Sequence, residues 1–288
     1  MADLEQLISD KAAADAQWRE QRQAEQEAAA NLRDESVAEI ASDPEAFVRY
    51  LDMQGDNPAY SAGNIALVMK QAPEATVVFT RDRWKSRGRF VLETEQEKGS
   101  KIFVKSSADR SYTLADTFDV TQTQGRDLCK PRLEDDTQEM ETALASLLNY
   151  SPVQVMAQVG LDAGAYYDPQ NMVLAVDPNY SDSEAFGAIA AEIAHARFHN
   201  RGFNWEYSRE SCELSAQSVS YILCRRFGIS REQPDLSRQP DLFRGWQAQG
   251  QLDALNAIRN MSKQIGGGIE KSLAPPQRAA PAVHRDAR

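Results

Sequence analysis

The chain of 288 residues contains few of the features that mark secreted or membrane proteins. Its three cysteines, Cys129, Cys212 and Cys224, form no CxxC pair and no disulfide framework, which favours a reducing compartment. It has no apolar run long enough to span a bilayer and no apolar signal-peptide core near its start. We therefore expect a cytoplasmic protein with no membrane partner.

Positive charge is also scarce. The net charge is -11 at pH 7, which argues against a protein that binds nucleic acid over its whole surface. The charge is uneven, however. Residues 1–42 carry ten acids and four bases, whereas residues 81–89 carry five bases and one acid. We therefore expect a ligand with many phosphates to bind at this one basic segment, and not over the whole surface of the molecule.

Residues 2–42 contain no glycine or proline, and their Ala, Glu, Gln and Arg content predicts a long acidic helix. Its apolar positions do not keep an unbroken heptad. One interpretation is a solvated helix that docks at both ends. The other is a coiled-coil surface for a protein partner.

The rest of the chain predicts an α+β fold with two domains joined by a linker at 126–136. The first domain, 43–125, begins with a helix signal at Ser42-Asp43-Pro44-Glu45. Its expected elements are helices from Asp43 through Leu51, at Ser61–Lys70 and after Thr80, and strands at 90–92, 101–105 and 118–123.

The second expected domain, 137–262, is mainly helical with a short β-hairpin. Its expected elements are a helix at 137–149, strands at 153–156, 165–167 and 172–176, and helices from 181–183 through the histidine segment, at 210–227 and at 239–262. After Gly266-Gly267-Gly268 the composition is low in apolar bulk, so 263–288, with His284, is expected to be disordered.

Four features of the first domain are distinctive in combination. They are Asn64 followed by an apolar helix, Trp84 on a basic helix, Glu97-Lys98-Gly99-x-x-Ile102 before a strand, and the string Phe118-Asp119-Val120-Thr121-Gln122-Thr123-Gln124-Gly125. Together they resemble the N-terminal domain of the ArdC antirestriction family of plasmids and conjugative elements. The resemblance implies single-stranded DNA as the partner.

Single-strand binding needs basic side chains for phosphates and flat rings for base stacking. The candidates are Asn64, Arg81, Arg83, Trp84, Lys85, Arg87, Arg89, Lys101, Lys105 and Tyr112. Trp84 and Phe103 alternate with polar neighbours, which favours core positions for both. Tyr112 lies in a polar loop and is the better stacking candidate. An ordinary solvated helix remains the alternative for the basic run.

The most informative stretch of the second half is Glu192-x-x-His195-x-x-x-His199, which holds two of the chain's three histidines. On a helix these three residues share one face. The order of hairpin, Glu-x-x-His helix and second acidic helix is that of zinc peptidases, and this half resembles the zincin-like domain of the ArdC family. The matching stretches are Ala165–Pro169, Ala191–His195 and Glu213–Cys224.

The resemblance assigns Glu192 as the general base, His195 as a ligand and Glu213 as the third ligand, but Ala191 stands where the family has its first zinc-binding histidine. His199 restores an i, i+4 pair, so His195, His199 and Glu213 form a candidate Zn²⁺ set without the peptidase base beside it. Three hypotheses follow: a DNA-binding protein whose zincin-like domain is inactive, an active zinc peptidase, and a non-enzymatic adaptor or inhibitor of a host nuclease.

Overall fold

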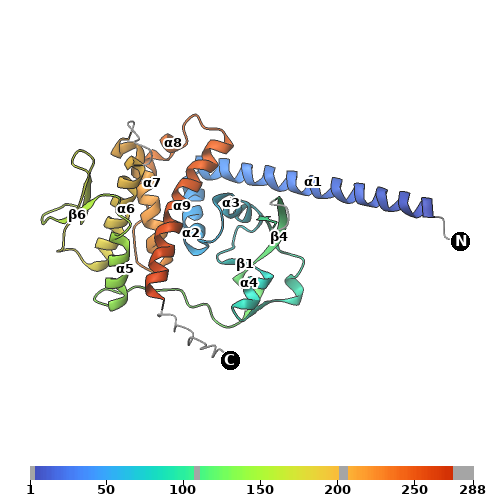
Figure 1. Ribbon diagram of the computed structural model, residues 1–288, viewed down its shortest axis with the longest axis horizontal. Coiled ribbons are helices and arrows are strands. Elements are labelled where there is room, and N and C mark those ends of the chain that lie inside the picture. The colour runs from blue at the N-terminus through green and yellow to red at the C-terminus, as the bar shows by residue number, and fades with distance from the viewer. Residues whose placement is uncertain (1–3, 107–110, 201–206, 275–288) are drawn as a thin grey trace, which may run out of the picture.

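A computed structural model describes residues 4–106, 111–200 and 207–274 (Figure 1). Its α-helices are α1 (Leu4–Ser42), α2 (Pro44–Asp56), α3 (Ala62–Gln71), α4 (Arg81–Ser86), α5 (Gln138–Leu148), α6 (Asp182–Asn200), α7 (Arg209–Arg226), α8 (Gln239–Leu242) and α9 (Ala248–Leu273). Its strands are β1 (Val78–Thr80), β2 (Arg89–Val91), β3 (Ser100–Lys105), β4 (Tyr112–Asp119), β5 (Thr123–Gly125), β6 (Gln154–Ala157), β7 (Ala165–Asp168) and β8 (Val173–Val176). The expected α+β class is confirmed.

The long helix α1 is confirmed, but it docks differently from the expectation. Its buried residues all lie near its C-terminal end, between Ala29 and Ala41, while Leu4, Leu7 and Ile8 are exposed. Figure 1 shows the N-terminal part reaching well beyond the rest of the molecule. The prediction that it docks at both ends is wrong for the described residues, because only its last turns carry apolar side chains against α2, α3 and α9.

The two helices after α1 begin where their capping residues predict. The Asp43 side chain accepts a hydrogen bond from the backbone N–H of Glu45 at 3.0 Å, with Pro44 in the first helical turn. Ser61 caps α3 by accepting from the N–H of Asn64 at 3.2 Å. Thr80 precedes α4 without a side-chain capping bond.

The first sheet has the strand order β1-β4-β3, all antiparallel. The single strand expected over 118–123 is wrong, because β4 ends at Asp119 and a 3-10 turn, Val120–Gln122, separates it from β5. The Asp119 carboxylate accepts from the N–H of Thr121 at 2.9 Å, and the Gln122 side chain accepts from the N–H of Asp119 at 2.9 Å. This capping box turns the chain out of the sheet.

The second half carries the expected hairpin. Strands β7 and β8 are antiparallel, and β6 adds parallel to β8, giving the order β6-β8-β7. Helix α6 packs on β7 and β8 and along α7, so the histidine segment lies between the sheet and a second helix.

Helix α9 is longer than its composition predicts. The prediction of a helix ending at 262 and disorder from 263 is wrong up to Leu273, because Ile265 and Ile269 are fully buried. The glycines permit close packing: a Cβ on Gly266 would lie 3.1 Å from Leu223 Cδ2, and one on Gly268 would overlap the Tyr150 ring. Residues 275–288, including His284, lie outside the described residues.

One large buried cluster runs from Val37 to Ile269 and includes residues of both expected domains. The segment 126–136 does not separate two cores, because Leu133 is buried and its N–H donates to the carbonyl of Phe227 at 2.9 Å. A small cluster of Val77, Trp84 and Phe118 lies under α4. Within the described ranges, none of the helices is long and apolar enough to cross a membrane.

Candidate functional site

The Glu-x-x-His segment lies on a helix whose start is defined by side chains. The Glu184 carboxylate accepts from the N–H of Ser181 at 3.1 Å, and the Ser181 hydroxyl accepts in return from the N–H of Glu184 at 3.4 Å. Farther along α6, Glu192 and His195 are both buried between β7 and α7. Buried polar groups need partners, and each has a complete set.

His195 pairs with the predicted ligand Glu213. Its Nε2 lies 3.1 Å from Glu213 Oε2, and its Nδ1 lies 3.1 Å from the Tyr207 hydroxyl. An ionised carboxylate only accepts hydrogen bonds, so Nε2 donates its proton to Glu213, and Nδ1 shares a hydrogen bond with the Tyr207 hydroxyl. Helices α6 and α7 thus place the two predicted ligands His195 and Glu213 in contact.

Glu192 has partners from two other elements. Its Oε2 accepts from the backbone N–H of Tyr167 in β7 at 2.7 Å. The Arg209 guanidinium donates to both of its oxygens, with Nη1 to Oε1 at 3.0 Å. The same Nη1 lies 3.6 Å from Glu213 Oε2. Arg209 thus lies between the two carboxylates of the site.

His199 is placed apart from this group. Its Nδ1 lies 2.7 Å from the Tyr167 hydroxyl, and its ring stacks on Tyr207 with centroids 4.5 Å apart. Among residues 4–106, 111–200 and 207–274, no three His, Cys, Asp or Glu side chains converge as a metal site requires. The candidate ligand set His195, His199 and Glu213 is therefore not assembled: i, i+4 spacing puts both rings on one side of α6, but two tyrosines hold His199 away from Glu213.

Burial and charge move the pKa values of the two carboxyls in opposite directions. The hydrogen bond from His195 lowers the pKa of Glu213 to about 2, and Gln217 and Arg209 contribute in the same direction against burial. Burial raises the pKa of Glu192, opposed chiefly by Arg209 and by the N–H of Tyr167. The site thus holds one strongly acidic carboxyl and one whose ionised form is disfavoured by burial.

This difference predicts a pH signature for Glu213→Gln. The folded-state pKa of Glu213 is below its ordinary value of 4.5, so its stabilisation is complete above that pH and is lost as the pH falls toward 2. We expect the difference in melting temperature between wild type and Glu213→Gln to be largest near pH 7 and to shrink below pH 4.5. Thermal unfolding from pH 7 to pH 3 measures it.

Glu192→Gln is the matched control. Because the folded-state pKa of Glu192 is raised, its effect on stability has the opposite pH dependence, so the melting temperature of wild type should rise relative to that of Glu192→Gln as the pH falls. Two parallel pH profiles would contradict the assignment of these opposite shifts.

Several predicted DNA-binding residues gather on one face of the first sheet. Side chains of directly opposed residues point to the same side of a sheet. The opposed pairs are Phe79 and Phe118, Lys101 and Asp116, Phe103 and Leu114, and Lys105 and Tyr112. Tyr112 is 60% exposed, as expected of a stacking ring, but it is the first residue of β4 and does not lie in a loop as predicted.

Helix α4 extends this face with charge. The guanidinium carbon of Arg81 lies 5.4 Å from the centroid of Phe118, and those of Arg83 and Arg87 lie 5.5 and 4.0 Å from that of Phe79. Lys85 is exposed. Within the described residues, none of these four basic side chains belongs to an ion pair.

Three of the candidates have structural partners instead. Trp84 is 0% exposed and donates its Nε1–H to the carbonyl of Phe118 at 2.8 Å. The Asn64 side chain bonds both the N–H and the carbonyl of Phe103 at 2.9 Å, which satisfies the outer edge of β3. Arg89 donates to Thr123 Oγ1 at 2.9 Å and to the carbonyl of Arg126 at 2.8 Å.

Sequence reasoning missed four residues: Trp18 and Arg22, which lie beside the same face, and Arg259 and Lys263 on α9, where the charge of Lys263 interacts with that of Arg83. Trp18 and Arg22 of α1 line a hollow of about 300 Å³ together with Lys101 and Leu114, and the Arg22 guanidinium lies 4.6 Å from the Trp18 ring centroid. On α9, proximity to Arg259, followed by burial and by Arg226 and Arg83, lowers the pKa of Lys263. Nothing local marks these four residues, because each lies far along the chain from the basic run.

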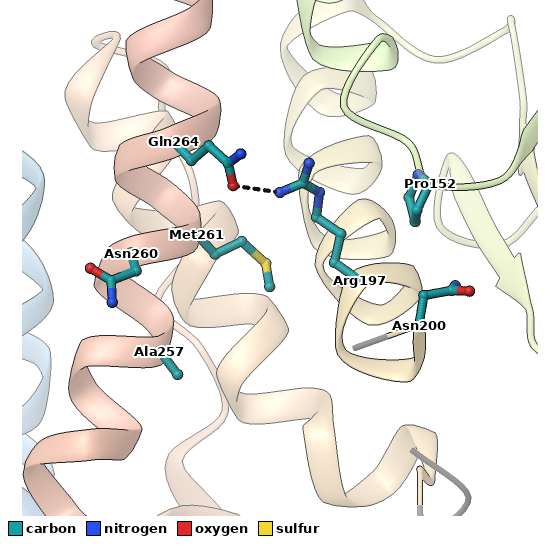
Figure 2. A pocket seen from close by; sticks show the side chains of 7 residues that line it. All are labelled: Pro152, Arg197, Asn200, Ala257, Asn260, Met261 and Gln264. Atoms are coloured by element: carbon teal, nitrogen blue, oxygen red, sulfur yellow. Dashed lines mark hydrogen bonds between the residues drawn. The ribbon is translucent and has the colours of Figure 1, made fainter. Parts of the chain in front are cut away.

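A further hollow, of about 360 Å³, lies between α6 and α9 (Figure 2). Arg197 crosses it, donating to Gln264 Oε1 at 2.8 Å and to the carbonyl of Tyr150 at 3.0 Å. Its lining consists of Pro152, Arg197, Asn200, Ala257, Asn260, Met261 and Gln264. None of these described lining residues is an acid, a histidine or a cysteine, so these seven side chains offer neither acid–base nor metal chemistry.

Comparison with known proteins identifies the fold. No family model and no curated protein matches the sequence. The crystal structure of the antirestriction ArdC protein from R388 plasmid with bound Mn(II) matches with a TM-score of 0.50 and 18% identity, over 85% of this chain and 99% of that chain. The chain has the ArdC fold. The metal-free structure of the same ArdC protein matches at 17% identity and a TM-score of 0.44, over 84% of this chain and 95% of that chain.

The Mn(II)-bound ArdC raises the question of a metal in this chain, and the described residues around His195 do not fit one. The cluster contains one histidine and two carboxylates, with an arginine between the carboxylates. The His195 nitrogen that faces Glu213 is already hydrogen-bonded to that carboxylate, so a metal would have to displace this contact. Ala191 is buried and offers no ligand.

Proposed function

We propose that this protein binds single-stranded DNA and acts in the cytoplasm as an antirestriction protein of a mobile element, as the ArdC protein of plasmid R388 is an antirestriction protein. The observation that carries the proposal is the exposed face of the first sheet within an ArdC fold. Tyr112 and Lys105 lie at one end of that face, and the guanidiniums of Arg83 and Arg87, which form no ion pair among the described residues, lie over the Phe79 ring at the other.

The arrangement suits an unpaired strand better than a duplex. Bases of a single strand can stack on an exposed ring such as Tyr112, while a basic groove follows the phosphates. Because the molecule as a whole is acidic, attraction of phosphates depends on local basic surfaces such as this face, and affinity should fall steeply with salt. Residues Lys101 and Asp116 form an ion pair at 2.8 Å, so Lys101 contributes less than the unpaired bases.

We predict that two variants separate stacking from charge. Tyr112→Ala should weaken binding of a labelled oligonucleotide by about 1–3 kcal/mol with an unchanged salt slope. Arg83→Glu/Arg87→Glu should weaken binding and also reduce the slope of log affinity against log salt, because phosphate contacts are lost. Fluorescence anisotropy at several salt concentrations measures both effects.

Arg244→Glu is the control for the charge change, since Arg244 is exposed and pairs with Asp241 on α8, away from the sheet face. Equal loss of binding in Arg244→Glu and in the α4 variant would mean that net charge, not this surface, governs binding. Binding without salt dependence would contradict the proposal.

The zincin-like half is proposed to be non-catalytic and to act as a scaffold. A zinc peptidase needs three protein ligands and a metal-bound water beside a general base. Here the base candidate, Glu192, is bound to Arg209. This geometry favours the adaptor hypothesis over the peptidase.

A protein partner for α1 is a second candidate, favoured by one observation. Leu4, Leu7 and Ile8 are exposed at i, i+3 and i+4 on the projecting part of an acidic helix, which makes an apolar stripe. We propose that this stripe binds a partner helix or a host nuclease. Retention of the same partners after Leu7→Ser/Ile8→Ser in a pull-down would count against it.

A further inference from the structure

Arg209 lies between the two carboxylates of the candidate site in the zincin-like half. It is the first residue of α7, and its guanidinium reaches Glu192 on α6 and Glu213 one turn along α7. Its guanidinium carbon also lies 4.8 Å from the centroid of the Tyr166 ring in β7. A single cationic side chain thus joins the strand and the two helices that form the site.

Every polar atom around this guanidinium has a partner within the chain. Glu192 Oε2 accepts from the N–H of Tyr167, and Glu213 Oε1 accepts from Gln217 Nε2 at 2.9 Å. The two nitrogens of His195 are bonded to Glu213 and Tyr207. No carboxylate oxygen or imidazole lone pair of the cluster is left without a partner.

The charge of the cluster also favours Arg209 over a metal ion. The carboxylate of Glu192 is buried and that of Glu213 is partly exposed beside it, so positive charge nearby is needed, and a divalent ion or a guanidinium can supply it. With Arg209 in place, a divalent ion would have to approach a fixed positive charge and break the hydrogen bond between His195 and Glu213. The two cations therefore exclude each other.

We propose that Arg209 is a built-in cation that takes the place of a metal, so that the protein is stable without divalent ions and exposes a latent metal site only when Arg209 is removed. Glu192 and Glu213 do not converge with His195 while Arg209 lies between them, and these three side chains would become the ligands once Arg209 is gone. This inference is independent of DNA binding, and its test contains no DNA.

The test compares wild type with Arg209→Ala by metal analysis after dialysis and by thermal unfolding in EDTA, Mn²⁺ or Zn²⁺. Wild type is expected to retain no stoichiometric metal and to melt at the same temperature in all three conditions. Arg209→Ala is expected to melt lower than wild type in EDTA, to retain about one ion per chain, and to regain melting temperature when metal is added.

Three further variants complete the test. Arg209→Gln is neutral and closer in size, and it replaces Arg209→Ala if that variant does not fold. Adding Glu192→Gln to the neutral variant should abolish the gained metal. Arg238→Ala, which removes an arginine that is ion-paired with Glu210 and Asp241, should gain none. Stoichiometric metal in wild type, no metal in the neutral variant, or an equal gain in Arg238→Ala would overturn the inference.

Discussion

Ile265→Ala and Ile269→Ala are each expected to lower the free energy of unfolding by about 2–5 kcal/mol. Both side chains are fully buried in the main core, on the part of α9 that follows the point where composition predicts disorder. Helix α9 packs there against α5 and α7, so truncation leaves a cavity that rigid helices cannot close. Urea denaturation monitored by circular dichroism measures the change.

Lys271→Ala is the matched control, because Lys271 is exposed on the same turn of helix and its truncation should change stability by less than about 0.5 kcal/mol. If the isoleucine variants were as stable as Lys271→Ala, the end of α9 would not be packed on the core. The expected contrast would instead make residues 263–273 part of the folded unit.

Trp84→Ala should be the most damaging single change in the first half, at about 3–5 kcal/mol. The indole is 0% exposed, packs at 80° to the Phe79 ring with centroids 5.0 Å apart, and donates to the carbonyl of Phe118. Removing it empties the small core under α4 and leaves that carbonyl without its indole donor. Chemical denaturation measures the loss.

Trp84→Phe decides between a core role and a DNA-stacking role. It keeps a ring in the small core but loses the donor to Phe118, so it should be less destabilised than Trp84→Ala and bind oligonucleotide as wild type does. A loss of DNA affinity comparable with that of Tyr112→Ala, in a variant of normal stability, would show that Trp84 stacks on bases.

Capping residues and turn residues in the sequence predicted the helices and the hairpin that short-range hydrogen bonds define. Asp43 before Pro44 and Ser61 before α3 mark helix starts, because a side-chain oxygen satisfies a free N–H within three residues. The hairpin of β7 and β8 was predicted from two short apolar runs around a turn at Asp168. The 3-10 turn after Asp119 was missed, because its capping box depends on β4 ending there.

Sequence also predicted part of the candidate site. The helix face carrying Glu192 and His195, and the meeting of His195 with Glu213, followed from helical spacing and from the resemblance to the zincin-like domain. The position of His199 did not follow, because the tyrosines that hold its ring come from β7 and from the segment before α7. Spacing along one helix defines which side chains share a face. It does not define which residues of other elements contact those side chains.

Taken alone, the sequence determined the long acidic helix, the Glu-x-x-His helix and the basic run around Trp84, because each depends on residues within a few turns of one another. Only the tertiary structure placed Arg209 between Glu192 and Glu213 and brought Tyr112 and Lys105 onto the face that α4 extends. It also decided that α9 continues through three glycines. The physical reason is the same in each case: ion pairs, strand register and helix packing join residues that are distant along the chain, and no local pattern records those partners.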